Sequence, residues 1–231
     1  MLAFSIFVSG SFTFGSLIAN EISPELLTFY RFLIATIILG VILYFNKSIY
    51  AHHLKNIWRY FVLGAIYSIY FVFMFVALKY TTTVSTAAIF TLLPLFAALL
   101  ERLFLKKSSP VLIWAALILS GMGALWIIFE GSINGLFQFR FEKGEAIFLV
   151  GTICYASYAI IQPKLFEGEN IYVTTLGVLA AGSIILAISL ILQQSSFIVG
   201  KITFEVFWVI FYLAIFASIG SISCLNYASP R

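Results

Sequence analysis

Two pairs of tyrosines are the side chains best suited to contact a ligand. Tyr67 and Tyr70 lie in one long apolar stretch, and Tyr155 and Tyr158 lie in another. A spacing of three residues places two side chains on the same face of a helix. A cavity lined by aromatic rings and hydroxyls would suit amphipathic organic solutes. The alternative is ordinary helix packing, in which aromatic side chains fill gaps between helices.

Arg31 is the only charged residue inside the stretches that we predict to cross a membrane. A charge within a bilayer is costly, which makes this residue a candidate functional group. It could contact an anion, or pair with Glu21 or Glu25 as part of a gate. Alternatively, at a depth of about 8 Å the side chain could reach the lipid headgroups. We predict that the four tyrosines line a shared central cavity, with Arg31 near its outer mouth.

Two further patterns lie on the predicted helices. Ser9, Thr13 and Ser16 follow one helical face and could line the same cavity or bond to neighbouring helices. Pro94 stands within the fourth apolar stretch, where it is expected to kink the helix and free a backbone carbonyl.

The sequence has no pattern typical of an enzyme, metal or nucleotide site. It contains no GxSxG, HExxH, P-loop or GxGxxG motif. His52 and His53 are adjacent, and no cluster of acidic residues accompanies them. Cys154 and Cys224 fit no zinc spacing and lie in apolar runs, so we interpret them as core residues. We therefore expect no catalytic residues, no metal and no cofactor.

Composition places these residues in a membrane protein. The 231 residues are 62% hydrophobic and only 10% charged, and the mean hydropathy is +1.09. An ordinary globular domain is about 25% charged. With a net charge of +4 spread over many short segments, no nucleic-acid surface is expected. The predicted fold is an all-α, polytopic membrane helix bundle, because the runs lack the alternation of β-barrel strands.

About eight segments have the length and apolarity of transmembrane helices. They are Leu2–Ala19, Leu26–Phe45, Tyr60–Leu78, Val84–Leu100, Val111–Phe129, Ala146–Ile161, Val173–Leu192 and Val206–Leu225. Ser23-Pro24 and Ser109-Pro110 are expected to begin helices.

Basic residues in the loops predict a cytoplasmic N-terminus. In that orientation the cytoplasmic side holds twice as many basic residues as the opposite side. The cytoplasmic ones are Lys47, Lys55, Arg59, Arg102, Lys106, Lys107, Lys164 and Arg231, and the opposite ones are Lys79, Arg140, Lys143 and Lys201.

The spacing of the spans contains a repeat. A short hairpin followed by a longer loop occurs near the start of the chain and again after residue 144. If the unit is five helices, the second copy must be inverted in the membrane, as in many secondary transporters. The predicted domains are a first five-helix repeat over 1–130 and an incomplete second repeat over 144–231. Continuing the spacing predicts two further helices, in a protein of about 280 residues. The alternative is a genuine eight-helix protein.

Several segments together resemble the EamA-type carriers of the drug/metabolite transporter superfamily. The resemblance rests on Pro24 with Phe29-Tyr30-Arg31-Phe32, on Ala77-Leu78-Lys79-Tyr80-Thr81-Thr82, on Thr91-Leu92-Leu93-Pro94-Leu95-Phe96, on Gly121 and Gly123, and on Asn226-Tyr227-Ala228. It extends over the whole chain. Lys107 departs from it, because the family commonly has a glutamate at that position.

This resemblance implies ten helices in two inverted repeats and a carrier of small organic solutes such as metabolites, amino acids or drugs. The implied location is the bacterial cytoplasmic membrane, the mechanism is alternating access, and the direction is export. The expected partners are the solute and the lipid bilayer, with a homodimer as a further option. The alternative function is a membrane-embedded enzyme or an assembly subunit without transport activity.

Overall fold

A computed structural model describes residues 2–47, 56–106, 110–129, 131, 142–166, 168–194 and 203–220. Within these residues every regular element is a helix. The helices are α1 (Leu2–Ile18), α2 (Pro24–Phe45), α3 (Ile57–Ala77), α4 (Thr83–Phe90), α5 (Leu93–Leu105), α6 (Val111–Ile128), α8 (Lys143–Leu165), α9 (Ile171–Leu192) and α10 (Phe204–Ala214), and α10 continues into the π-helix η2 (Ile215–Gly220). The prediction of an all-α chain is confirmed for this part.

Six helices of the described residues are long and apolar enough to cross a membrane. One of them is the combined stretch Thr83–Phe104, formed by α4 and α5, and two shorter apolar helices add Ile6–Ile18 and Phe204–Gly220. These eight stretches correspond to the eight predicted spans. The last residues of the eighth predicted span, 221–225, lie outside the described part.

Local sequence signals explain where several helices begin. The Ser23 hydroxyl accepts a hydrogen bond from the Leu26 N–H at 3.3 Å, and Pro24 takes the first position of α2, where its missing N–H is not needed. Asn170 caps α9 in the same way. Pro110 precedes α6. Both predicted proline-associated helix starts are confirmed.

The fourth apolar stretch is interrupted, as Pro94 predicts. α4 ends at Phe90 and α5 begins at Leu93. Proline has no N–H to donate to the carbonyl four residues earlier, which here is Phe90. The regular hydrogen-bond pattern of one continuous helix therefore cannot pass through this position.

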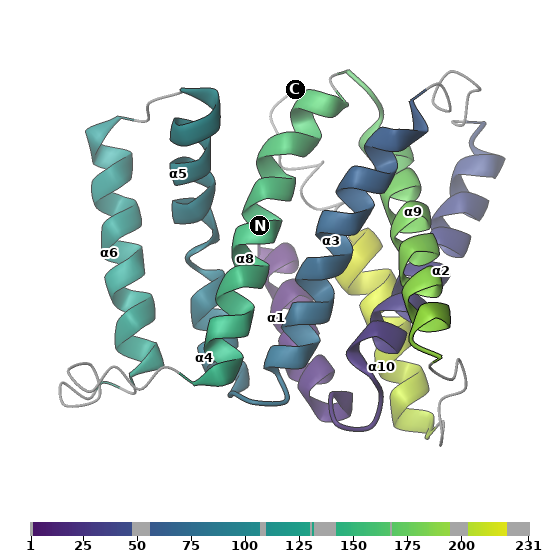
Figure 1. Cartoon of the computed structure of the whole chain (residues 1–231), viewed down its shortest axis with the longest axis horizontal. Helices are drawn as coiled ribbons and strands as arrows, with labels where there is room; N and C mark the ends of the chain where they lie inside the picture. Colours follow the sequence, from purple (N-terminus) through teal and green to yellow (C-terminus); the bar gives the residue numbers. More distant parts are fainter. Residues whose placement is uncertain are drawn as a thin grey trace. The chain divides into compact units, whose positions relative to one another are not determined.

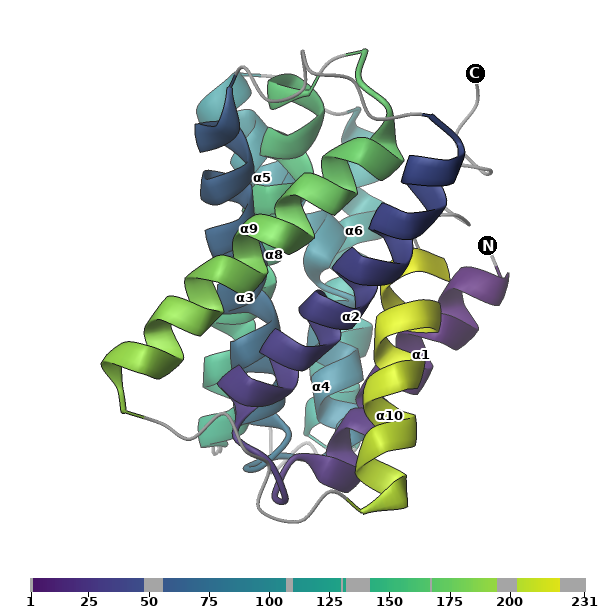
Figure 2. The same cartoon turned by 90° about the vertical axis from the view of Figure 1, so that its right-hand side faces the viewer.

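The chain divides into two compact units. Unit 1 consists of Met1–Ser68 and Leu165–Arg231, and unit 2 consists of Ile69–Lys164. In unit 1, α2 packs along α9, and α10 with η2 contacts both α1 and α2 (Figure 2). The first part of α3 approaches α9 so closely that a Cβ on Gly64 would lie 2.9 Å from the Val178 carbonyl oxygen. A glycine permits this backbone contact, as is common between membrane helices.

In unit 2, α6 packs against α4 and α5 (Figure 1). α8 packs against the last part of α3 and the turn that follows it. A Cβ on Gly144 would lie 2.7 Å from the Ala77 carbonyl oxygen, and one on Gly151 would lie 3.1 Å from Phe73 Cβ. Small residues thus bring these two helices into contact.

Candidate functional site

Arg31 is buried in unit 1 and is only 1% exposed. Its Nε donates to Ser218 Oγ at 3.0 Å, and its Nη2 donates to the Ala217 carbonyl at 3.4 Å. Both acceptors belong to η2, and the Ser218 hydroxyl itself donates to the Leu213 carbonyl. The guanidinium therefore joins α2 to the π-helical segment after α10. Burial to this extent is inconsistent with the alternative that the side chain reaches out to lipid headgroups.

Tyr67 lies in the same unit, near the guanidinium. Its ring stacks on Phe32 with a centroid separation of 5.5 Å, and its hydroxyl lies within electrostatic range of Arg31. π-Helical segments frequently occur at functional sites. Arg31, Tyr67 and Ser218 of η2 together form a buried polar group in unit 1.

The other three predicted tyrosines meet in unit 2. The Tyr70 ring stacks on the Tyr155 ring with a centroid separation of 4.5 Å, and the Tyr155 ring stacks on the Tyr158 ring at 5.8 Å. The ring centroid of Phe90 lies 5.9 Å from that of Tyr155, and the ring centroid of Phe148 lies 6.1 Å from that of Tyr70. Tyr70 and Tyr158 are buried, whereas Tyr155 is half-buried. The cluster can offer aromatic faces and phenol hydroxyls to a planar or amphipathic solute.

The predicted site residues therefore form two groups, one in each unit. Arg31 and Tyr67 belong to unit 1, and the three-tyrosine cluster belongs to unit 2. That all five residues line one cavity remains a prediction.

The serine and threonine stripe of α1 satisfies its own hydrogen bonds. Ser9 Oγ donates to the Ile6 carbonyl at 3.1 Å, and Thr13 Oγ1 donates to the Ser9 carbonyl at 3.3 Å. Ser16 Oγ donates to the Thr13 carbonyl at 2.8 Å. Hydroxyls in helices commonly bond backward in this way. This accounts for the stripe without a ligand.

Glu145 is a buried carboxylate that the sequence analysis did not single out. It is 2% exposed at the start of α8, and its Oε2 accepts a hydrogen bond from the Glu142 N–H at 3.0 Å. A glutamate that reaches back to the residue before a helix is part of a capping box. The spacing of Glu142 and Glu145 was the only available signal, and it is weak without Ser or Thr at the first position.

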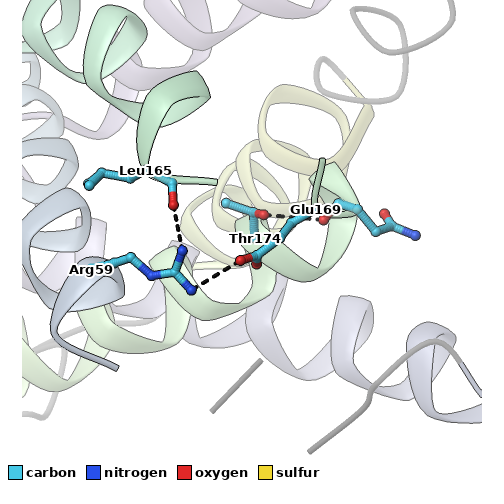
Figure 3. Close-up of polar contacts among 5 residues, drawn as sticks. Arg59, Leu165, Glu169 and Thr174 are labelled. Atoms are coloured by element: carbon cyan, nitrogen blue, oxygen red, sulfur yellow. Dashed lines mark hydrogen bonds and ion pairs between the residues drawn. The ribbon is translucent and has the colours of Figure 1, made fainter. Parts of the chain in front are cut away.

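A second missed group joins the start of α3 to the turn between α8 and α9 (Figure 3). Arg59 Nη2 lies 3.0 Å from Glu169 Oε1, and Nη1 donates to the Leu165 carbonyl. The guanidinium carbon lies 4.6 Å from the centre of the Phe166 ring. We call these four residues the Arg59–Glu169 network. No local sequence signal predicts it, because 110 positions separate the two charged residues.

The described residues contain no group of three His, Cys, Asp or Glu that could hold a metal. Cys154 is a half-buried free thiol. His52, His53, Lys107 and Cys224 lie outside the described residues.

Comparison with known proteins identifies a family. The sequence matches the EamA-like transporter family over residues 1–129, which is more than half of the chain. It is 28% identical over 221 residues to the uncharacterized transporter YyaM of Bacillus subtilis, covering 95% of this chain and 72% of that protein. It is 26% identical over 189 residues to an uncharacterized transporter of Archaeoglobus fulgidus, covering 80% of this chain and 64% of that protein.

Proposed function

The chain belongs to the EamA-like transporter family, and from this premise we propose that it is a carrier of small organic solutes. It is a multi-pass membrane protein of a transporter family rather than of an enzyme family. The proposed mechanism is alternating access, in which two inverted repeats move about a central binding site. The proposed location is the bacterial cytoplasmic membrane, and the proposed direction is export.

The observation that best supports this mechanism is the pattern of contacts between helices. If residues 1–130 and 144–231 are repeats, then α1, α2 and α3 correspond to α8, α9 and α10. A two-fold relation between repeats requires that each contact has a counterpart when corresponding helices are exchanged.

The described contacts follow this rule. α1 contacts α10, and the exchanged pair, α8 and α3, meets at Gly151 and Phe73. α2 contacts α10, and the exchanged pair, α9 and α3, meets at Gly64 and Val178. α2 and α9, which exchange with one another, pack together. The contacts therefore support an arrangement of two related repeats.

For substrate binding we propose the two groups of side chains described above. Tyr70, Tyr155 and Tyr158 would offer stacking surfaces and hydroxyls to the organic part of a solute. Arg31 and Tyr67 would contribute a buried cation and a phenol. A mixed apolar and polar lining suits solutes that are amphipathic rather than purely ionic.

The proposal is tested by reconstituting the purified chain into phospholipid vesicles. The vesicles are incubated with a mixture of amino acids, nucleosides and aromatic metabolites, and the retained solutes are identified by mass spectrometry. We expect one or more solutes to equilibrate faster than in empty vesicles. Exchange of the same solutes should slow when Tyr70 and Tyr155 are both replaced by alanine. Uptake no faster than in empty vesicles for the whole mixture would favour the assembly-subunit alternative.

A further inference from the structure

We propose that the Arg59–Glu169 network is an ionic gate that holds one end of unit 1 closed. This inference rests on the proposed alternating-access function, because it assigns a part of that cycle to named residues. The gate lies at the end predicted to face the cytoplasm, since both of its loops belong to that side in the predicted topology.

The network bridges the two proposed repeats. Arg59 is in the first turn of α3, in the first proposed repeat. In the second proposed repeat, Leu165 ends α8, and Phe166 and Glu169 lie in the turn between α8 and α9. One guanidinium makes three interactions there: an ion pair, a hydrogen bond to a backbone carbonyl and a cation–π contact. Any movement that separates these repeats at this end must break all three together.

The ion pair is neither fully exposed nor fully buried. The side chains of Arg59 and Glu169 are 15% and 17% exposed, so water and ions can reach them. Arg59 Nε is buried and has no hydrogen-bond partner among the described residues. An unsatisfied donor offsets part of what the other contacts contribute. The closed arrangement is therefore held by contacts that can be exchanged for water.

Glycine contacts provide a point about which this end can move. Gly64 lies five residues after Arg59, about 7.5 Å along the helix, where α3 touches the backbone of α9 at Val178. Nearer the end, the Tyr60 ring lies over Gly177 and 4.8 Å from the Phe166 ring. Helices in close contact at one point can change their angle there while their ends separate. The network lies on the end beyond this contact.

The corresponding position at the other end of the unit carries no charges. The start of α9 at Ile171 follows the start of α2 at Pro24 by a fixed number of residues. The start of α10 at Phe204 follows the start of α3 at Ile57 by the same number, so the two pairs share one sequence offset. At that offset Arg59 corresponds to Val206, and Glu169 corresponds to Ile22. Both are buried apolar residues. The ionic network of one end thus has buried apolar side chains at the corresponding positions of the other, so we expect only the network to respond to salt or loss of charge.

The gate is tested by the reactivity of a buried thiol beside it. Thr174 is 1% exposed in the first turn of α9, next to Glu169 (Figure 3). Thr174→Cys is introduced into the chain with Cys154 and Cys224 replaced by serine, and reaction with N-ethylmaleimide is followed in bilayer nanodiscs. We expect Glu169→Gln to accelerate the reaction about tenfold, as expected for losing one charge-assisted interaction. Arg59→Gln removes all three contacts of the guanidinium and should accelerate the reaction at least as much. The double variant should react no faster than the faster single variant.

Two controls separate gate opening from general loosening. Ser183→Cys reports on a buried position of α9 far from the network, and its reactivity should not change. Arg102→Gln removes an exposed arginine on the same predicted side and should not accelerate the Thr174 position. The proposal is overturned if the thiol at position 174 reacts within about twofold of the parent rate, if Arg102→Gln has an equal effect, or if position 183 accelerates in parallel.

A measurement without network variants covers the case in which those variants fail to fold. Raising the salt concentration from about 0.01 M to about 1 M shortens the Debye length from about 30 Å to about 3 Å and weakens a partly exposed ion pair. We expect faster reaction at position 174 in high salt and no change at position 183, and an unchanged rate at position 174 overturns the proposal. Because no substrate is needed, this result is independent of whether the vesicle assay detects transport.

Discussion

At the scale of single residues, Arg31 is a buried charge whose hydrogen bonds are expected to contribute to the stability of unit 1. Arg31→Ala removes the donor from two buried oxygens, Ser218 Oγ and the Ala217 carbonyl. We expect the free energy of unfolding to fall by about 2 kcal/mol. The thermal midpoint, followed by intrinsic fluorescence in detergent, should decrease by several degrees. Arg102→Ala is the matched control, because that arginine is exposed, and its midpoint should stay near that of the parent. Equal shifts in both variants would contradict a buried role for Arg31.

The hydroxyls of the tyrosine groups can be tested without disturbing their rings. Tyr67→Phe keeps the stacking on Phe32, and Tyr155→Phe keeps the stacking on Tyr70. Each variant should therefore keep the parent's thermal midpoint while weakening the affinity for a transported solute by about tenfold, the cost of losing one hydrogen bond. Affinity is measured as the half-saturating concentration in vesicles. Tyr44→Phe, at an exposed position, is the control. If neither site variant changed the affinity, the two tyrosines would be packing residues and not ligand contacts.

Residue types and spacing predicted only part of these groups. The three-residue spacing correctly placed Tyr155 and Tyr158 together, and Tyr70 joins them because α8 packs on α3. Local spacing could not show that the hydroxyls of α1 bond to their own helix. It also could not reveal that Arg59 and Glu169 meet, since their contact depends on how α3 and α9 pack.

At the scale of helices, replacing two glycines by alanine is predicted to have opposite effects on stability. A methyl group on Gly64 would meet the backbone of α9 at 2.8 Å and 2.9 Å, and backbone cannot rotate away. Gly64→Ala should therefore lower stability by about 1–3 kcal/mol, as overpacking does. Gly123 in α6 has no atom within 4 Å of such a methyl group. Gly123→Ala should raise stability by about 1 kcal/mol, because alanine is the better helix former.

Both glycine variants are compared by thermal unfolding under identical conditions. A decrease for Gly64→Ala with an increase for Gly123→Ala would agree with the close approach of α3 and α9. If Gly64→Ala were as stable as the parent, the two helices would have to be farther apart than described.

Helix positions were the most predictable feature of this scale. Length and apolarity located each span, and Ser23-Pro24 and Pro94 marked a start and an interruption through the missing proline N–H. The predicted spans were shorter than the helices in places, because polar end residues such as Lys143 and Glu145 continue α8. Apolarity does not identify a helical turn that is built from polar residues.

At the scale of the whole molecule, the proposed repeat appears in the sequence only as spacing between spans. Spacing indicates which helices correspond, and the contacts of α2 with α9 and of α3 with α8 are consistent with that correspondence. The contacts themselves could not be derived from the sequence, because all helices are similarly apolar and many faces are equally suited to burial.

The orientation of the whole molecule in the membrane determines which face the Arg59–Glu169 network lies at. The Arg59–Glu169 network requires the start of α3 and the turn before α9 to lie at the same membrane face. The excess of basic residues predicts that this face is cytoplasmic. In cells carrying a chain without Cys154 and Cys224, Lys164→Cys should react with an impermeant maleimide only after permeabilisation. Tyr80→Cys, at an exposed turn predicted on the opposite side, should react in intact cells. Labelling of the first position and protection of the second in intact cells would reverse the topology, and the ionic gate would then face outward.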